Sequence, residues 1–325
     1  MDVPPRISVV TPSFNQAAYL EQTLRSVIEQ GYPNLEYIVI DGASTDASVE
    51  IIRRYERHLH YWTSEPDQGQ AEAVNKGLAR ATGEIVGWLN SDDYYLPGAL
   101  QAAARAFAEH PECGLVYGDV LAVDGNDRVI NELRYGHWTL EDLLSFNIIG
   151  QPAVLLRRTV LEQVGGLDPR LHFLLDHQLW LRVAQRAPIY YVPERWAAAR
   201  FHAEAKNVAK AASFGQEAYA IVAWMQTQPG LVNDYQRLQR RIWSGAHRLN
   251  ARYLSEGDQP AAALAAYGRS FLASPRVALR DWRRVLLTIL SLFGVRWLRP
   301  LAQRMRQNRY ANLHGAGKFD QEKKI

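Results

Sequence analysis

The stretch IVGWLNSDD, residues 85–93, joins a short apolar run to four consecutive polar residues. Its apolar part, Ile85 to Leu89, is typical of a strand buried on both faces of a parallel sheet. Two adjacent carboxylates, Asp92 and Asp93, follow where such a strand would end. Open α/β sheets bind ligands at this end of their strands, and hard divalent cations prefer carboxylate oxygens. The stretch therefore predicts a cation site, with a solvated turn as the alternative because Asn, Ser and Asp favour turns.

The residues before this stretch alternate between strand and helix patterns. Short β-rich or apolar runs alternate with segments whose apolar residues recur at helical spacing. Strands are predicted at 7–11, 35–40, 60–63 and 84–89, and helices at 20–28, 49–55 and 71–81. A strand-helix alternation of this kind indicates the α/β class, with a mostly parallel sheet and right-handed crossovers.

Polar clusters follow each of the four predicted strands. They are Thr11 to Asn15, Asp41, Glu65 to Gln70, and Asn90 to Asp93. Because parallel strands end at the same edge of a sheet, the four clusters are expected to converge, and a nucleotide is the ligand that suits them. The chain contains neither GxGxxG nor GxxxxGK[ST], which disfavours dinucleotide and P-loop binding. The phosphates are therefore expected to be bound through a metal ion.

Two longer segments resemble the family 2 glycosyltransferases of GT-A fold. They are VVTPSFNQAAYLEQTLRSVIEQGYPNLEYIVIDGASTD (9–46) and EPDQGQAEAVNKGLARATGEIVGWLNSDD (65–93). The resemblance implies a Rossmann-like nucleotide-binding sheet and transfer of a sugar from a nucleoside diphosphate. The family's DxD signature falls on residues 90–92, so its first carboxylate is the amide Asn90 in this chain. The expected roles are ribose contact for Asp92 and direct metal ligation for Asp93.

The same resemblance implies further donor-site residues. It places Thr11, Pro12 and Ser13 along the nucleotide, Asp41 against the base, and Asp67, Gln68, Asn75 and Lys76 near the diphosphate and sugar. For Lys76 an exposed helix lysine is the alternative.

A candidate general base lies in the second half of the chain. The segment FLLDHQLWLR (173–182) carries apolar residues at helical spacing and resembles the family's acidic pair followed by an LWLR-like stretch. Asp176 occupies the position of the second acid, the general base, and Leu175 replaces the first. A carboxylate can take the proton of an acceptor hydroxyl within hydrogen-bond reach. Capping of its own helix is the alternative role for Asp176.

The fragment Ala199 to His202 resembles the family's Arg-x-His segment, expected after a last core strand at 189–192. The resemblance makes His202 a second metal ligand. Because imidazole suits transition metals, it favours Mn²⁺ over Mg²⁺.

These interpretations predict an inverting, metal-dependent glycosyltransferase. The donor is expected to be a UDP-sugar, with dTDP and GDP open, and the acceptor a hydroxyl of a glycan or lipid-linked intermediate in surface polysaccharide synthesis. The alternatives are a polyprenyl-phosphate glycosyltransferase and a catalytically silent nucleotide-sugar or glycan-binding module. A nucleotidyltransferase is disfavoured because its glycine-rich, basic N-terminal loop is absent.

The sequence also predicts how the chain is organised. A catalytic domain is expected at 1–205, with nucleotide-sugar binding in 1–95 and the acceptor side in 96–205. A helical C-terminal region follows at 206–310, and a disordered tail at 311–325. The N-terminus has no signal-like pattern and Cys113 is the single cysteine, so a cytoplasmic protein is expected.

A basic amphipathic segment is predicted at 275–310. It has nine arginines against one acid, Asp281, although the whole chain carries only +3. The apolar run from Val285 to Val295 is about half the ~20 residues that a membrane span needs. Peripheral contact with the anionic inner face of a membrane is the favoured interpretation, with a helix packed on the protein's own core as the alternative. Nucleic-acid binding is disfavoured, because no recognised motif accompanies the charge.

Overall fold

The computed structural model describes residues 4–202 and 211–292, which divide into two compact units. Among these residues, the first unit contains 4–137 and 149–200. The second unit contains 138–148, 201–202 and 211–292. The second part of the predicted basic segment, 293–310, and the predicted tail, 311–325, lie outside the described residues.

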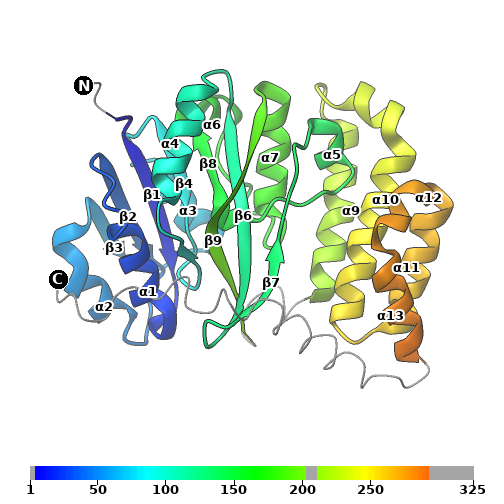
Figure 1. Cartoon of the computed structure of the whole chain (residues 1–325), viewed down its shortest axis with the longest axis horizontal. Coiled ribbons are helices and arrows are strands. Elements are labelled where there is room, and N and C mark those ends of the chain that lie inside the picture. The colour runs from blue at the N-terminus through cyan, green and yellow to red at the C-terminus, as the bar shows by residue number, and fades with distance from the viewer. Residues whose placement is uncertain (1–3, 203–210, 293–325) are drawn as a thin grey trace. The chain divides into compact units, whose positions relative to one another are not determined.

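The first unit is built from alternating strands and helices (Figure 1). Its strands are β1 (Ile7–Ser13), β2 (Leu35–Asp41), β3 (Tyr61–Ser64), β4 (Ile85–Trp88), β5 (Tyr94–Tyr95), β6 (Leu115–Asp124), β7 (Val129–Leu133), β8 (Val154–Arg157) and β9 (Ile189–Phe201). Its helices are α1 (Ala17–Ile28), α2 (Ser48–Tyr55), η1 (Glu56–His58), α3 (Gln70–Leu78), α4 (Ala99–Glu109), η2 (Gln151–Ala153), α6 (Arg158–Val164) and α7 (Leu175–Arg186).

The strands of the described residues form one nine-stranded sheet in the order β3-β2-β1-β4-β8-β6-β9-β5, with β7 paired to β6. The four N-terminal strands, β1 to β4, pair in parallel. The later pairs, β4 with β8, β6 with β8, β6 with β7 and β5 with β9, are antiparallel. The predicted α/β class with a Rossmann-like parallel sheet is therefore confirmed, and antiparallel strands extend that sheet.

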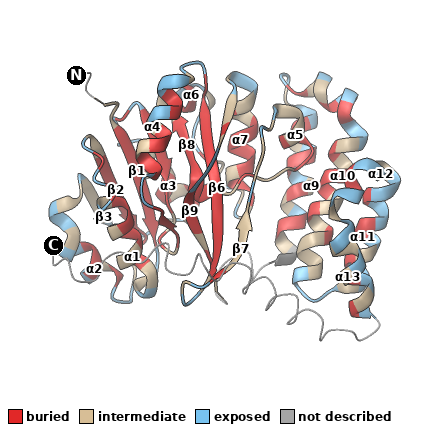
Figure 2. Cartoon of the chain, in the orientation of Figure 1, coloured by how far each residue is buried: buried red, intermediate tan, exposed pale blue. Residues whose placement is uncertain are grey.

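Helices cover both faces of the sheet because the side chains of a strand alternate between them. Val9 of β1 belongs to the large core cluster that includes Leu24 of α1 and Phe107 of α4. Its neighbour Val10 points to the opposite face and lies against Gly77 of α3, where an added Cβ would come within 2.3 Å of the valine. Gly77 thus allows α3 to pack closely on β1. Figure 2 shows the resulting buried residues along the strands.

The second unit is helical in its described part, apart from the end of β9. Its helices are α5 (Leu140–Leu144), α9 (Ala211–Thr227), α10 (Val232–Glu256), α11 (Pro260–Ala273), α12 (Pro275–Ala278), η3 (Leu279–Asp281) and α13 (Trp282–Leu292). The helical appendage predicted at the C-terminus is thereby confirmed. Among the residues described, no helix combines the length and the apolar character needed to cross a bilayer.

Candidate active site

The ends of β1, β2 and β3 lie side by side at one edge of the sheet. In the parallel register, Ser13 pairs with Asp41, and Asp41 with Ser64. The fully buried Asp41 carboxylate accepts hydrogen bonds from the hydroxyls of Ser44 and Ser64, at 2.6 and 2.7 Å, and from the Ser44 backbone N–H. These donors fix the orientation of the predicted base-contacting carboxylate.

The three predicted residues of β1 have different surroundings. The Thr11 hydroxyl lies 2.9 Å from the Tyr37 hydroxyl inside the core, and Pro12 is also buried. Ser13, at the end of the strand, is 3% exposed, and its Oγ has no hydrogen-bond partner among the described residues. A buried hydroxyl normally finds a partner, so Ser13 Oγ is suited to meet a ligand.

Asp67 lies against Gly42, the residue that follows β2. A Cβ added to Gly42 would lie 2.7 Å from Asp67 Oδ2, so a larger residue here would displace this carboxylate from its present position. The other oxygen, Asp67 Oδ1, accepts the backbone N–H of Gly69. The neighbouring Gln68 is exposed.

The polar stretch after β4 is a turn that holds a buried carboxylate. The Asp93 N–H donates to the Asn90 carbonyl at 3.0 Å, and the Thr23 hydroxyl donates to the Asp93 carbonyl at 2.6 Å. The Asp93 side chain is 6% exposed and accepts the Arg200 N–H at 2.9 Å. The Asn90 side chain accepts from Gln70 Nε2 at 2.6 Å. The structure therefore shows a turn in this stretch, and the turn positions the buried Asp93 carboxylate.

The electrostatics of Asp93 favour a nearby cation. Burial and the adjacent charge of Asp92 raise the pKa of Asp93 well above its usual value. The Arg200 N–H and the Asn90 amide lower the pKa, but by less. A positive ion beside the two carboxylates would offset the cost of burying this charge.

Arg200 is a structural residue of this site to which sequence analysis assigned no role. Its Nε donates to the Asp92 carbonyl at 3.0 Å, and its two terminal nitrogens donate to Asp127 and Gln22, each at 2.6 Å. The Arg-x-His fragment that contains it was expected after the last strand, whereas β9 continues to Phe201. Arg200 therefore reaches the turn from within the sheet. The fragment itself was the signal that could have revealed this role.

Two predicted residues of α3 interact with other side chains or backbone groups of the same chain. The Asn75 amide donates to the Leu167 carbonyl at 2.9 Å and accepts the Leu167 N–H at 2.8 Å. Lys76 forms ion pairs with Glu65 and Glu72, at 3.2 and 3.0 Å. The structure thus shows Asn75 holding the loop before α7, and Lys76 with two carboxylates beside it.

Asp176 and His202 belong to different units of the structure. Asp176 is half-buried in the first turn of α7, and its Oδ1 accepts the His177 backbone N–H at 2.7 Å. His202 directly follows β9 and belongs to the second unit.

The carboxylate oxygens after β4 suit a divalent metal ion. Across residues 4–202 and 211–292, no group of three or more His, Cys, Asp and Glu side chains is arranged to hold a metal. Ions such as Mg²⁺ commonly use one or two carboxylates and complete their coordination with water and substrate phosphates. The Asp93 carboxylate is a donor of this kind.

Residues 8–165 match the family model described as Glycosyl transferase family 2. TuaG of Bacillus subtilis strain 168, a glycosyltransferase named for teichuronic acid biosynthesis, is 33% identical over 190 residues. The alignment covers 56% of this chain and 73% of TuaG. The chain therefore belongs to glycosyl transferase family 2 and is a glycosyltransferase, as the sequence predicted.

Two solved structures share its fold. Residues 1–349 of Staphylococcus aureus TarS, in complex with UDP-GlcNAc, superpose with a TM-score of 0.58 at 17% identity, covering 86% of this chain and 92% of TarS 1–349. The mannosyltransferase PcManGT of Pyrobaculum calidifontis, with GDP-Man and Mn²⁺, gives 0.59 at 22%, covering 94% and 87%. These similarities establish the GT-A fold.

Proposed function

We propose that the chain transfers a sugar, with inversion, from a UDP-sugar to a hydroxyl of a glycan or lipid-linked acceptor in surface polysaccharide synthesis. The observation that carries the proposal is the buried Asp93 at the end of β4, whose charge is compensated only in part by Arg200 and Asn90. Such a site suits the diphosphate of a nucleotide sugar together with a divalent ion.

The donor would lie along the ends of the parallel strands. Ser13, with its unpartnered Oγ among the described residues, and the oriented Asp41 carboxylate would contact the nucleoside. The backbone of Thr11 and Pro12 would line the same site. Asp67, Gln68 and Lys76 would lie near the diphosphate and sugar. Asn75 would act there by positioning the loop at Leu167.

Asp93 and His202 would hold the divalent ion, Mn²⁺ in preference to Mg²⁺, and Asp92 would contact the ribose. When bound, such an ion neutralises charge on the departing nucleoside diphosphate.

Asp176 would act as the general base. Its carboxylate accepts the proton of the acceptor hydroxyl while that oxygen bonds to the anomeric carbon. The bond from that carbon to the diphosphate breaks in the same step, and the diphosphate leaves with the electron pair. Attack opposite the leaving group inverts the anomeric configuration. The name of the relative TuaG supports a cell-envelope polymer as the acceptor.

The test combines donor binding with turnover. Stabilisation against heat is measured with UDP-, dTDP- and GDP-sugars, with and without Mn²⁺, since a ligand of the native state raises its stability. Release of nucleoside diphosphate is then measured with the stabilising donor and candidate acceptors, and the product's anomeric configuration is determined by NMR.

Asp176→Asn is expected to keep donor binding and lose about 10²–10⁴-fold in turnover, the usual contribution of a general base. Glu50→Gln, which changes an exposed carboxylate on α2, is the matched control and should leave both unchanged. Full turnover in Asp176→Asn would point to an acceptor that needs no base, such as a polyprenyl phosphate. Donor binding without turnover on any acceptor would indicate a silent binding module.

A further inference from the structure

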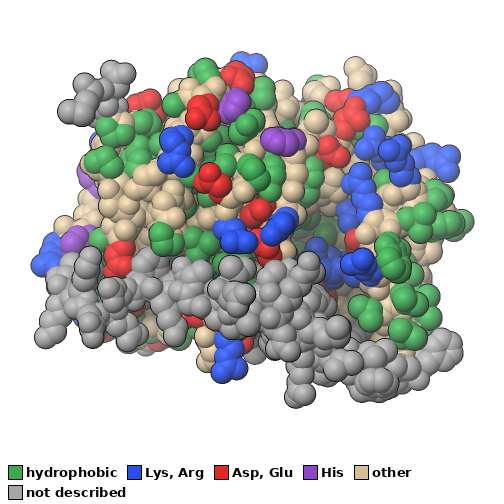
Figure 3. All heavy atoms as spheres, viewed as in Figure 1, with side chains coloured by type: hydrophobic (Ala, Val, Ile, Leu, Met, Phe, Trp, Pro, Cys, Tyr) green, Lys and Arg blue, Asp and Glu red, His purple; other side chains and the backbone are tan. Residues whose placement is uncertain are grey.

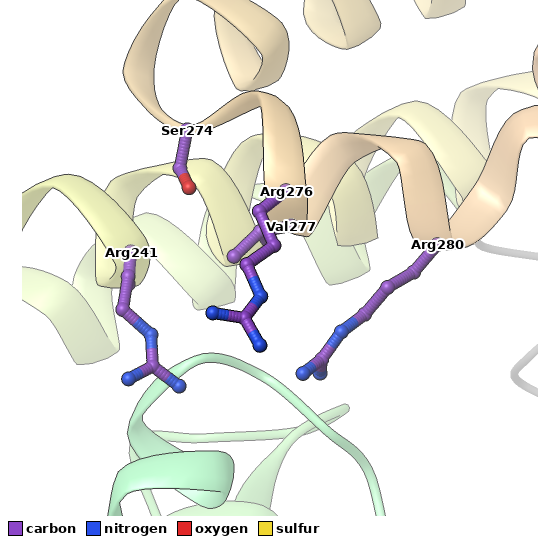
Figure 4. Close-up of a pocket in the computed structure, with 5 residues that line it drawn as sticks. All are labelled: Arg241, Ser274, Arg276, Val277 and Arg280. Carbon is purple, nitrogen blue, oxygen red and sulfur yellow. The ribbon is translucent and has the colours of Figure 1, made fainter.

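Three arginines converge on a pocket in the second unit (Figure 4). Arg241 of α10, Arg276 of α12 and Arg280 of η3 line a cavity of about 180 Å³ together with Ser274 and Val277. Their guanidinium groups extend to the same side in Figure 4. Guanidinium groups bind phosphate oxygens through paired, charge-assisted hydrogen bonds.

The pocket carries more positive charge than its neighbours compensate. Arg241 lies 3.3 Å from Glu141, a carboxylate that also pairs with Arg237 at 2.6 Å. Arg280 donates to the neutral amide oxygen of Asn147. Arg276 has no hydrogen bond or ion pair with any of the residues that the structure describes. An anion is therefore the ligand that this pocket would attract.

Large apolar side chains are exposed on the same segment. Leu279 and Trp282 are 56% and 54% exposed, and Leu286 and Ile289 continue the row along α13 at helical spacing. Figure 3 shows hydrophobic side chains gathered over this part of the second unit, beside Lys and Arg side chains. A group of exposed apolar residues bordered by arginines is typical of helices that lie in the interface of a bilayer.

We propose that this surface, the basic-apolar face, docks on an anionic lipid bilayer. The face is defined by Arg241, Arg276, Leu279, Arg280, Trp282, Leu286 and Ile289. The arginine pocket binds the phosphate of a lipid headgroup, and the apolar row enters the boundary between headgroups and acyl chains. A soluble phosphate would satisfy the arginines but leave the apolar row exposed, so the combination favours the lipid. The proposal is independent of the sugar donor and of catalysis.

The experiment is co-sedimentation of the full chain with vesicles. Vesicles of phosphatidylcholine alone are compared with vesicles containing phosphatidylglycerol, at low and high salt. Binding is expected only to the anionic vesicles and to weaken with salt, because exposed charges are screened. Arg276→Gln combined with Arg280→Gln should weaken it about thirty-fold, since each basic residue near an anionic surface contributes about a factor of five.

Two matched variants separate the face from general charge and from catalysis. Arg53→Gln removes one exposed positive charge from α2, so it should have little effect on binding. Asp176→Asn should bind vesicles like the parent even where turnover is lost. Leu286→Ser should weaken binding at high salt, where the apolar contribution remains.

Equal binding to both kinds of vesicle would overturn the proposal, as would an Arg53→Gln effect as large as that of the pocket variant. Stabilisation by inorganic phosphate without vesicle binding would also overturn it, because the pocket would then serve a soluble anion.

Discussion

The backbone N–H of Arg200 donates a hydrogen bond of 2.9 Å to Oδ1 of Asp93, although the residues lie 107 positions apart in the chain. The Arg200 guanidinium also donates a hydrogen bond to the Asp92 carbonyl, and its Cζ lies 4.4 Å from the centre of the Tyr19 ring. The strand β9 thus supports the acidic turn after β4 from both its backbone and its side chain. The Arg200 guanidinium therefore stabilises the turn through the Asp92 backbone carbonyl.

Replacing Arg200 with Met should destabilise the first unit. The change leaves Asp127, Gln22 and the Asp92 carbonyl without their charged donor, and loss of one partner from such a buried network costs about 3 kcal/mol. Urea unfolding measures the difference. The control is Arg128→Met at an exposed position, which is expected to change the free energy of unfolding by less than about 0.5 kcal/mol. Equal effects of the two variants would contradict the supporting role of Arg200.

The stability of the metal-free protein should depend on pH through Asp93. Because burial and the charge of Asp92 raise the pKa of Asp93 in the folded state, the unfolded chain loses this proton at lower pH than the folded chain does. The free energy of unfolding therefore falls as pH rises above about 4, the usual pKa of a free aspartate, until the pH exceeds the raised pKa. Asp93→Asn should remove this penalty.

Thermal unfolding from pH 4 to pH 9 in the presence of a chelator tests the effect. The variant should gain stability relative to the parent as pH rises, with little difference at pH 4. Added Mn²⁺ should stabilise the parent more than Asp93→Asn. If the parent instead became more stable than Asp93→Asn as pH rises in chelator, the protein itself would compensate the Asp93 charge in full.

Asn75 should act on the loop before α7. Asn75→Ala removes both hydrogen bonds to Leu167, and at about 1 kcal/mol for each bond the free energy of unfolding should fall by about 2 kcal/mol. Urea unfolding is the measurement, and Asn126→Ala at an exposed turn is a control expected to be neutral. A neutral Asn75→Ala that instead weakens donor binding would mean that the amide contacts the diphosphate directly.

Gly42→Ala should displace Asp67 while leaving the fold intact. The new Cβ would lie 2.7 Å from Asp67 Oδ2, so the carboxylate must move, whereas the backbone at this glycine does not need a positive φ. If Asp67 contacts the donor, its affinity should fall about tenfold, or about 1.4 kcal/mol. Calorimetric titration with the stabilising nucleotide sugar measures this.

The matched glycine variant is Gly268→Ala in α11, where the added Cβ meets open space. It should raise the free energy of unfolding by about 0.5–1 kcal/mol, because alanine loses less backbone entropy in a helix. Donor affinity should not change. Unchanged donor affinity in Gly42→Ala would remove Asp67 from the donor site.

The sequence by itself determined the α/β class and the edge of the sheet that holds the candidate site. The four predicted N-terminal strands correspond to β1, β2, β3 and β4. Strand and helix periods depend on residues only a few positions apart, so a single sequence displays them directly. The family motifs lie at the ends of those strands. They identified the chain as a glycosyltransferase.

Only the tertiary structure decided which side chains meet across long separations. It showed that Arg200 is hydrogen-bonded to the acidic turn and Asn75 to Leu167. It also showed that Arg241, Arg276 and Arg280 line one pocket. It also assigned residues 138–148 to the helical unit. Such partners depend on how distant segments pack, and packing is selected by the shape and burial of the whole core, which local periodicity does not encode.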